Sequence, residues 1–221
     1  MEIRTYPLGP LQANMYAIIM GKDCFIIDPC VPIDTLGLES YQIRAIFCTH
    51  GHFDHVTEAD RMVEYTGSPL LISRKDEALL RDAGKNGSGD FMRCMDVKTP
   101  VCYMEENDFY TAADFQMATD EDFSIRVIST PGHTPGSVSI LFSFSSPSTQ
   151  EYLFTGDTLF AGSIGRTDLG GSDSDMRHSL ALLADLDERI ICYPGHGAST
   201  TIRKEKMENP YFTATFYNDM I

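Results

Sequence analysis

Short runs of apolar residues, separated by polar or glycine-containing turns, recur along the whole chain and predict β-strands. The first two runs are joined by the tight turn 21–23, which predicts a hairpin. The run 45–48 is apolar throughout, as in a buried strand, whereas Phe123, Ile125 and Val127 alternate with polar residues. The strands predicted from this pattern are 14–20, 24–29, 45–48, 70–72, 123–127, 138–142, 152–154 and 189–193.

Between several of these strands the apolar residues recur at helical spacing instead. Val56, Ala59 and Met62 are each three residues apart, and Gly67 follows as a stop signal. The helices expected from such stretches cover residues 33–44, 56–66, 75–82 and 176–187.

Three stretches fit neither pattern. Residues 84–89 are rich in glycine but lack the Gly-Lys-Ser/Thr ending and the preceding strand of a phosphate-binding loop, so we expect a flexible lid or a connector. Residues 90–122 are weakly periodic and rich in carboxylates, and we expect an irregular insertion at one edge, without a domain boundary. Residues 143–150 are expected to be a polar hairpin loop.

The side chains most capable of binding metal are concentrated in the heptad Thr49–His55, directly after the strand 45–48. Its sequence, T-H-G-H-F-D-H, holds three of the six histidines of the chain and an aspartate. Close imidazoles repel one another once protonated and lose hydration when buried, so a fold that gathers them usually binds a cation. Because a predicted helix follows, the heptad is expected to be a strand-to-helix turn.

Two more histidines and a second aspartate also follow strand ends. His133 and His196 each close a Pro-Gly-His turn, and Asp157 lies in Thr-Gly-Asp-Thr just after the strand 152–154. Side chains that follow strand ends converge on one rim in α/β proteins. We therefore expect these residues to form one site with the heptad.

These side chains are sufficient to bind two metal ions about 3.5–4 Å apart with a bridging carboxylate. The assignment is His50, His52 and His133 to one ion, Asp54, His55 and His196 to the other, and Asp157 as the bridge. Nitrogen and carboxylate ligands without a thiolate suit zinc, the expected ion, as well as iron or manganese. Two roles stay open: Asp54 as the N-cap of the next helix, and Asp28 as a turn former or as the partner of a ligand histidine.

Composition narrows the class of protein. A chain of 221 residues is long enough for one sizeable core, and a formal net charge of −15 argues against nucleic acid as a partner. No apolar stretch has the length of a membrane span and no signal peptide is recognisable, so a cytoplasmic location is expected. The six cysteines form no C-x-x-C pair, and we expect buried thiols.

Four motifs resemble the metallo-β-lactamase superfamily: T-H-G-H-F-D-H at 49–55, T-P-G-H-T-P-G-S at 130–137, F-T-G-D-T-L-F at 154–160 and Y-P-G-H-G at 193–197. The resemblance implies a four-layer αββα sandwich, an α/β (α+β) fold with a dinuclear metal site on one edge. Residues 161–168 and the motif Asn209–Tyr211 resemble short bacterial glyoxalase II-like (hydroxyacylglutathione hydrolase-like) hydrolases. We expect a single domain over 1–221, without the separate C-terminal helical domain of full-length glyoxalase II.

This resemblance implies a metal-dependent hydrolase that cleaves a thioester, with a glutathione thioester such as S-lactoylglutathione as the expected substrate. A metal-bridging hydroxide would attack the carbonyl, with Asp54 and Asp157 as the catalytic carboxylates. Arg166 falls where the glyoxalase II family places a basic glutathione contact, which makes it the candidate for binding a substrate carboxylate, and Asp168 is a second candidate.

Other functions remain open at this stage. Persulfide dioxygenases resemble the chain equally in G-R-T-D at 165–168, and they would hold a single iron on His50, His133 and Asp157. Hydrolysis of another ester, lactone or lactam and a non-catalytic metal-binding role are further alternatives, and a nuclease is disfavoured by the acidity of the chain. The expected partner is a small-molecule thioester, with no nucleic acid and no membrane, and the expected assembly is a monomer or a small homo-oligomer.

Overall fold

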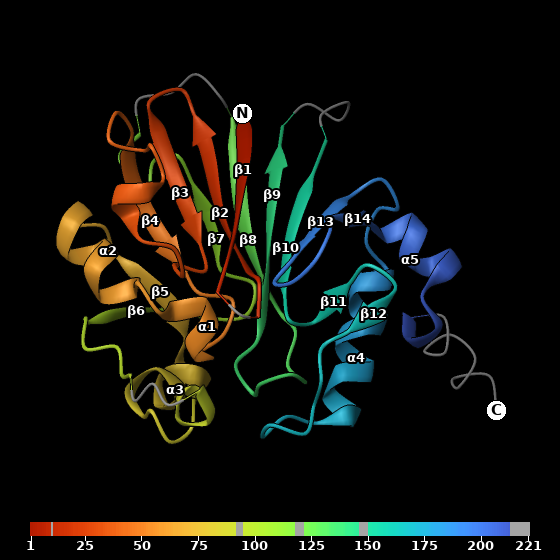
Figure 1. The fold of residues 1–221 in the computed structure, drawn as a ribbon. Coiled ribbons are helices and arrows are strands. Elements are labelled where there is room, and N and C mark those ends of the chain that lie inside the picture. Colours follow the sequence, from red (N-terminus) through yellow and green to blue (C-terminus); the bar gives the residue numbers. More distant parts are fainter. Residues whose placement is uncertain (10, 92–94, 118–121, 146–149, 213–221) are drawn as a thin grey trace. The chain divides into compact units, whose positions relative to one another are not determined.

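The structure is a computed structural model that describes residues 1–9, 11–91, 95–117, 122–145 and 150–212 (Figure 1). Contacts divide the chain into two compact units, Met1–Met104 and Glu105–Ile221. Each unit is built on one six-stranded sheet. Within the described ranges, none of the helices has the length and apolar character needed to cross a membrane.

The sheet of the first unit has the strand order β1-β2-β3-β4-β5-β6, which is also the order along the chain. The first three strands pair antiparallel, and the pairs from β3 to β6 are parallel. The strands are β1 (Glu2–Leu8), β2 (Ala13–Met20), β3 (Asp23–Ile27), β4 (Gln42–Phe47), β5 (Leu70–Ser73) and β6 (Val101–Met104). The helices are η1 (Ile33–Thr35), α1 (Phe53–Val56), α2 (Ala59–Thr66), η2 (Arg74–Asp76), α3 (Glu77–Arg81) and η3 (Ser88–Phe91).

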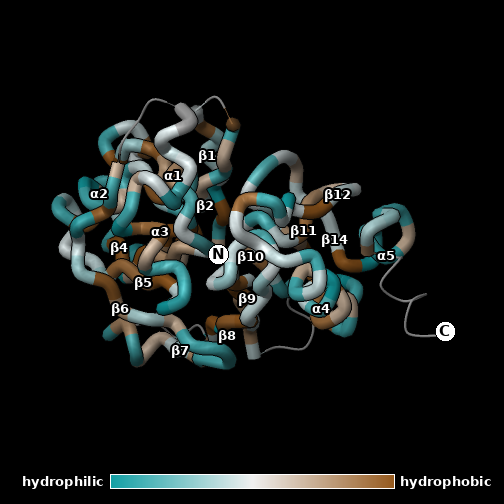
Figure 2. The backbone as a smooth tube through the Cα atoms, turned by 90° about the horizontal axis from the view of Figure 1, so that it is seen from below, coloured by the Kyte–Doolittle hydropathy of each residue, from teal (hydrophilic) through white to brown (hydrophobic). Residues whose placement is uncertain are grey.

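Buried parallel strands explain the continuous apolar runs of this unit. In Figure 2 the tube is brown over β4 and β5, whereas hydrophilic and hydrophobic colours alternate along the amphipathic α2. Ala59 and Met62 of α2 pack in one cluster with Ile26, Ile46 and Leu70 of the sheet. The helix ends as its sequence predicts, because Gly67 has a φ of 70° and donates its N–H to the Val63 carbonyl.

The second unit has the strand order β14-β13-β10-β9-β8-β7, in which only the pair β10–β13 is parallel. Its strands are β7 (Phe109–Thr111), β8 (Phe123–Ser129), β9 (Val138–Phe144), β10 (Tyr152–Gly156), β13 (Ile191–Pro194) and β14 (Thr200–Thr201). A two-stranded hairpin, β11 (Leu159–Phe160) and β12 (Ser163–Ile164), and the helices α4 (Asp173–Ala184) and α5 (Ile202–Glu208) complete it. Met176 and Leu180 of α4 and Ile202 of α5 pack in one cluster with Leu153 and Cys192 of the sheet.

The eight predicted strands and the helices at 56–66, 75–82 and 176–187 are confirmed, with shifted bounds. The helix expected over 33–44 is wrong. Only η1 forms there, Gly37 takes a φ of 64°, and β4 begins at Gln42. The strand β1 was not predicted at all, although it pairs over its full length with β2.

The prediction of an irregular insertion over 90–122 is wrong in part, because β6 and β7 each add an edge strand to a sheet. Both are short, with four residues in β6 and three in β7, so each offers too few positions for a periodic pattern to be recognised. The single-domain expectation stays a prediction.

The glycine-rich loop 84–89 is held by buried polar groups. Asn86 donates its side-chain amide to the Met95 carbonyl and accepts the N–H of Ser88, and its own carbonyl accepts the N–H of Phe53 at 3.0 Å. These bonds favour the connector over the lid.

The described cysteines are free thiols, as expected. Cys24, Cys30, Cys48 and Cys192 are buried, Cys102 is exposed, and Cys94 lies outside the described residues. Burial raises the pKa of Cys24 to about 12, so its thiol stays neutral.

Candidate metal centre

Four candidate ligands, His50, His52, Asp54 and His55, follow the end of β4; we call them the first ligand cluster. His50 and His52 lie in the turn, and Asp54 and His55 lie in α1. The N-cap of α1 is His52 and no side chain caps it, so Asp54 is not the N-cap. The three imidazoles are buried, with the ring of His50 4.9 Å from that of His52 and 4.4 Å from that of His55.

The turn that carries these histidines has a tight backbone. Gly51 donates its N–H to Asp76 Oδ2 at 3.0 Å, and a Cβ at position 51 would lie 2.6 Å from the Cβ of Leu79. Only glycine fits there without moving α3. No sequence pattern marks Asp76, because Arg74–Glu77 has the composition of an exposed helix start although Asp76 is fully buried.

Asp28 orients His55. It directly follows β3 with a left-handed φ of 55° and accepts the Thr49 N–H at 2.7 Å on Oδ1. Its Oδ2 lies 2.8 Å from the Thr49 hydroxyl and 2.9 Å from His55 Nδ1. A carboxylate only accepts hydrogen bonds, so His55 carries its proton on Nδ1 and keeps the lone pair of Nε2 for a ligand. Of the two roles considered for Asp28, the orientation of a ligand histidine is the one that these contacts support.

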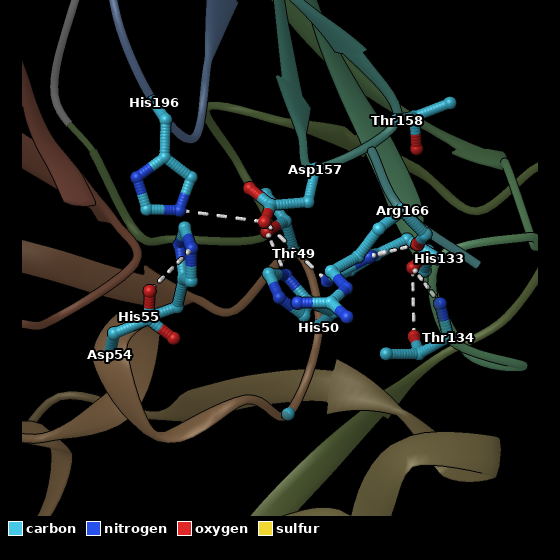
Figure 3. Close-up of polar contacts among 12 residues, drawn as sticks. Thr49, His50, Asp54, His55, His133, Thr134, Asp157, Thr158, Arg166 and His196 are labelled. Carbon is cyan, nitrogen blue, oxygen red and sulfur yellow. Dashed lines mark hydrogen bonds and ion pairs between the residues drawn. The ribbon is translucent and has the colours of Figure 1, made fainter. Parts of the chain in front are cut away.

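One atom each of Asp28, His50 and His55 lies within 4.8 Å of the others. Both Asp28 oxygens already accept hydrogen bonds, so we regard Asp28 as a support and not as a ligand. Asp54 Oδ2 lies 3.7 Å from His55 Nε2 and keeps an exposed fraction of 15%, which leaves this carboxylate accessible (Figure 3).

His133, Asp157 and His196 form the second ligand cluster. Asp157 Oδ2 lies 3.4 Å from His133 Nε2 and 3.5 Å from His196 Nε2 (Figure 3). Asp157 and His196 come together because β10 and β13 are parallel and end side by side, with the Gly195 N–H bonded to the Gly156 carbonyl at 2.8 Å. His133 Nδ1 lies 2.7 Å from the Arg166 carbonyl, to which it donates, so the lone pair of Nε2 is again left for a metal.

A segment that follows the β11–β12 hairpin lies against this second cluster. Gly165 donates its N–H to the Thr158 carbonyl, and a Cβ at position 165 would lie 1.7 Å from the Asp157 carbonyl oxygen. The glycine therefore permits an approach that also places the Arg166 carbonyl beside His133.

The two residues predicted to bind the substrate, Arg166 and Asp168, bind each other. Arg166 donates from Nε and Nη2 to the two carboxylate oxygens of Asp168 at 2.6 and 2.5 Å. Both are exposed. The hydrogen bonds from Arg166 lower the pKa of Asp168 to about 2.

The donor set fits a metal centre. Each cluster combines imidazole nitrogens with a carboxylate, which suits zinc, iron or manganese. Cys48 precedes the first cluster, but burial raises its pKa well above the ordinary value, so it supplies no thiolate.

A mixed α/β fold with histidine and aspartate clusters at strand ends defines a metal-binding α/β protein. The sequence pattern of the Metallo-beta-lactamase superfamily matches residues 8–196. The chain therefore belongs to this superfamily, and the predicted family and fold class are confirmed.

Among its relatives are the "Probable metallo-hydrolase YqgX" of Bacillus subtilis, 33% identical over 96% of this chain and 97% of the relative, and the "Hydroxyacylglutathione hydrolase GloC" of Haemophilus influenzae, 29% identical over 97% and 99%. Among solved structures, the BLEG-1 B3 metallo-beta-lactamase has a TM-score of 0.83 at 34% identity over 96% of this chain and 100% of that chain. TTHA1623 in a di-iron-bound form has a TM-score of 0.75 at 32% identity, over 94% and 99%. The chain is a metal-dependent hydrolase of this superfamily.

Proposed function

We propose that the protein hydrolyses a thioester, and that the substrate is a glutathione thioester such as S-lactoylglutathione. The observation that carries this proposal is the pair of ligand clusters, in which histidines anchored at Nδ1 leave Nε2 for metal beside a carboxylate. The relative GloC, named a hydroxyacylglutathione hydrolase, covers nearly the whole chain and supports the choice of substrate.

Two divalent ions are proposed, bound by the seven side chains of the two clusters. His50, His52 and His133 would hold one ion, Asp54, His55 and His196 the other, and Asp157 would bridge them. Zinc is the proposed ion, and iron is the alternative that the di-iron form of TTHA1623 supports.

When bound, the ions supply Lewis acidity and a nucleophile at neutral pH. The protein residues position the reaction. Asp28 and the Arg166 carbonyl fix the tautomers of His55 and His133. Asp54 orients the nucleophile, Arg166 contacts a carboxylate of the substrate, and Asp168 holds the Arg166 side chain in place through their paired hydrogen bonds.

The test is thiol release from S-D-lactoylglutathione by purified, metal-loaded protein, with and without a chelator. We expect release that the chelator abolishes. Asp157→Asn should lose most of both metal and activity, because it removes a carboxylate oxygen that lies within 3.5 Å of two histidines. Full metal occupancy in that variant would exclude Asp157 as a bridge.

The same preparation separates the alternatives. Hydrolysis of a chromogenic β-lactam without thioester cleavage would favour a lactamase, a possibility raised by the similarity to BLEG-1. Oxygen consumption with glutathione persulfide would favour the dioxygenase.

A further inference from the structure

A cavity of about 800 Å³ lies in the second unit. Its walls include Ile164, Arg166, Met176, Arg177, Leu180 and Tyr211. One face of α4 contributes to it, because residues 173, 176, 177 and 180 follow helical spacing. The volume lies in the range of small-molecule binding sites, about 300–1,000 Å³.

The cavity adjoins the second ligand cluster through a shared segment. Gly165 and Arg166 line it, and the same two residues contact that cluster, Gly165 against the Asp157 backbone and the Arg166 carbonyl against His133. A molecule in the cavity would therefore contact the same segment that contacts two proposed metal ligands.

The charged groups of the cavity differ in what they already bind. Arg166 uses Nε and Nη2 on Asp168, and Asp173 accepts the hydroxyl of Thr167. Among the described residues, Arg177 makes no side-chain hydrogen bond and no ion pair. The complete guanidinium fork of Arg177 is thus available to a ligand.

The floor of the cavity is apolar. Met176 and Leu180 each have an exposed fraction of 1%, so their contacts fix the part of α4 from which Arg177 projects. An apolar surface beside a guanidinium suits a ligand that carries an aliphatic chain and an anionic end.

We propose that this cavity binds the thiol carrier of the substrate and that Arg177 binds the anionic group of that carrier. The inference rests on the proposed thioesterase function. It assigns the anion contact to Arg177 in addition to Arg166, whose fork is largely used within the protein. The anion is a carboxylate in a peptide carrier such as glutathione, or a phosphate in a nucleotide carrier such as coenzyme A.

Binding is measured by calorimetry with the metal-loaded protein and two probes that it cannot hydrolyse, S-methylglutathione and coenzyme A. We expect one of them to bind, and Arg177→Ala to weaken that binding about tenfold, the typical effect of losing a charge-assisted hydrogen bond. Arg177→Lys keeps the charge without the fork and should recover part of the loss. Arg203→Ala is the matched control, because Arg203 is an exposed arginine of α5 that does not line the cavity.

A kinetic measurement completes the test. For the carrier that binds, Arg177→Ala should raise KM about tenfold with kcat nearly unchanged. The KM for S-lactoyl-N-acetylcysteamine, whose carrier has no anionic group, should not change in that variant.

The outcomes separate the two proposals. Hydrolysis with normal KM and Kd in Arg177→Ala overturns the role of Arg177 while the thioesterase function stands. Carrier binding that depends on Arg177, without thioester cleavage, overturns the thioesterase function and supports the cavity. Binding of neither probe to the wild-type protein overturns the carrier site.

Discussion

Asp28 illustrates how a residue outside the ligand clusters controls them. Its backbone adopts a φ of 55°, a conformation that costs energy in a residue other than glycine and that asparagine and aspartate tolerate best. This backbone conformation allows the buried carboxylate of Asp28 to accept hydrogen bonds from Thr49 and from His55. Asp28 acts on the first ligand cluster by holding the ring proton of His55 on Nδ1.

Asp28→Asn is expected to weaken metal binding by about 10–100-fold. Asparagine keeps the shape and tolerates the left-handed backbone, but its amide can donate to His55 Nδ1, which would move the ring proton to Nε2, the proposed ligand atom. The measurement is competition for zinc with a chromophoric chelator. Asp34→Asn removes an exposed partner of Arg61 and is the control; equal affinities for both variants would contradict this role of Asp28.

The ion pair of Arg166 and Asp168 stabilises the fold only over a defined range of pH. The pKa of Asp168 is about 2 in the folded protein, below the value of about 3.9 expected in the unfolded chain. The pair therefore contributes its full stabilisation at pH values above the pKa of the unfolded chain. This stabilisation is lost as the pH falls through about 2. Titration of the Asp168 carboxyl by NMR should show the low pKa, and Arg166→Ala should return it toward about 3.9; an unchanged titration would exclude the pair in solution.

At the scale of elements, α5 fixes the segment that leads to the second ligand cluster. Glu205 is fully buried and accepts hydrogen bonds from the Thr200 hydroxyl, the Gly162 N–H and the Asn209 side-chain amide. Asn209 donates in turn to the Ser163 carbonyl at 2.9 Å. The β11–β12 hairpin is thereby attached to the helix at two consecutive backbone groups.

Glu205→Gln should lower the free energy of unfolding by about 1–3 kcal/mol, because a neutral amide replaces the carboxylate and its hydrogen bonds are no longer charge-assisted. Urea denaturation measures the change. Glu208→Gln, on the exposed side of the same helix, is expected to stay within about 0.5 kcal/mol of the wild type. A Glu205→Gln protein as stable as that control would show that the three hydrogen bonds contribute little.

The sequence predicts those helices and strands that have a recognisable pattern of apolar and polar residues within their own segment. Every candidate ligand is expected to follow the end of an apolar strand, because a buried strand has a strong pattern and glycine marks the turn after it. His50, His52, His133, Asp157 and His196 lie in such turns, whereas Asp54 and His55 lie in the helix α1 that follows the turn. The strands β1, β6 and β7 were missed because edge strands are held by pairing with a neighbour, which no local pattern records. The roles of Asp76 and Glu205 could not be predicted for the same reason, because their burial depends on residues far along the chain.

For the molecule as a whole, each unit carries one ligand cluster, so bound metal should stabilise each unit. Free metal at about 100 times its Kd adds about 2.7 kcal/mol to the free energy of unfolding. For a chain of 221 residues this corresponds to a rise in Tm of about 5–10 °C.

Calorimetry with and without a chelator measures this shift, and hydrogen exchange shows where it acts. Amides of β4 and of β10 should both lose protection when the metal is removed. Loss confined to one unit would mean that only one ligand cluster binds metal under those conditions.

The order of pairing along the chain also bears on how the molecule folds. In the antiparallel pair β8–β9 the residues Ser129 and Val138 close a short loop, whereas Tyr152 and Ile191 of the parallel pair β10–β13 are 39 residues apart, from 191 − 152. Closing the longer loop costs about 1.3 kcal/mol more chain entropy than closing the shorter one. The contact that places Asp157 beside His196 is therefore expected to form after the hairpins, so ligands from the two ends of this loop meet only late in folding.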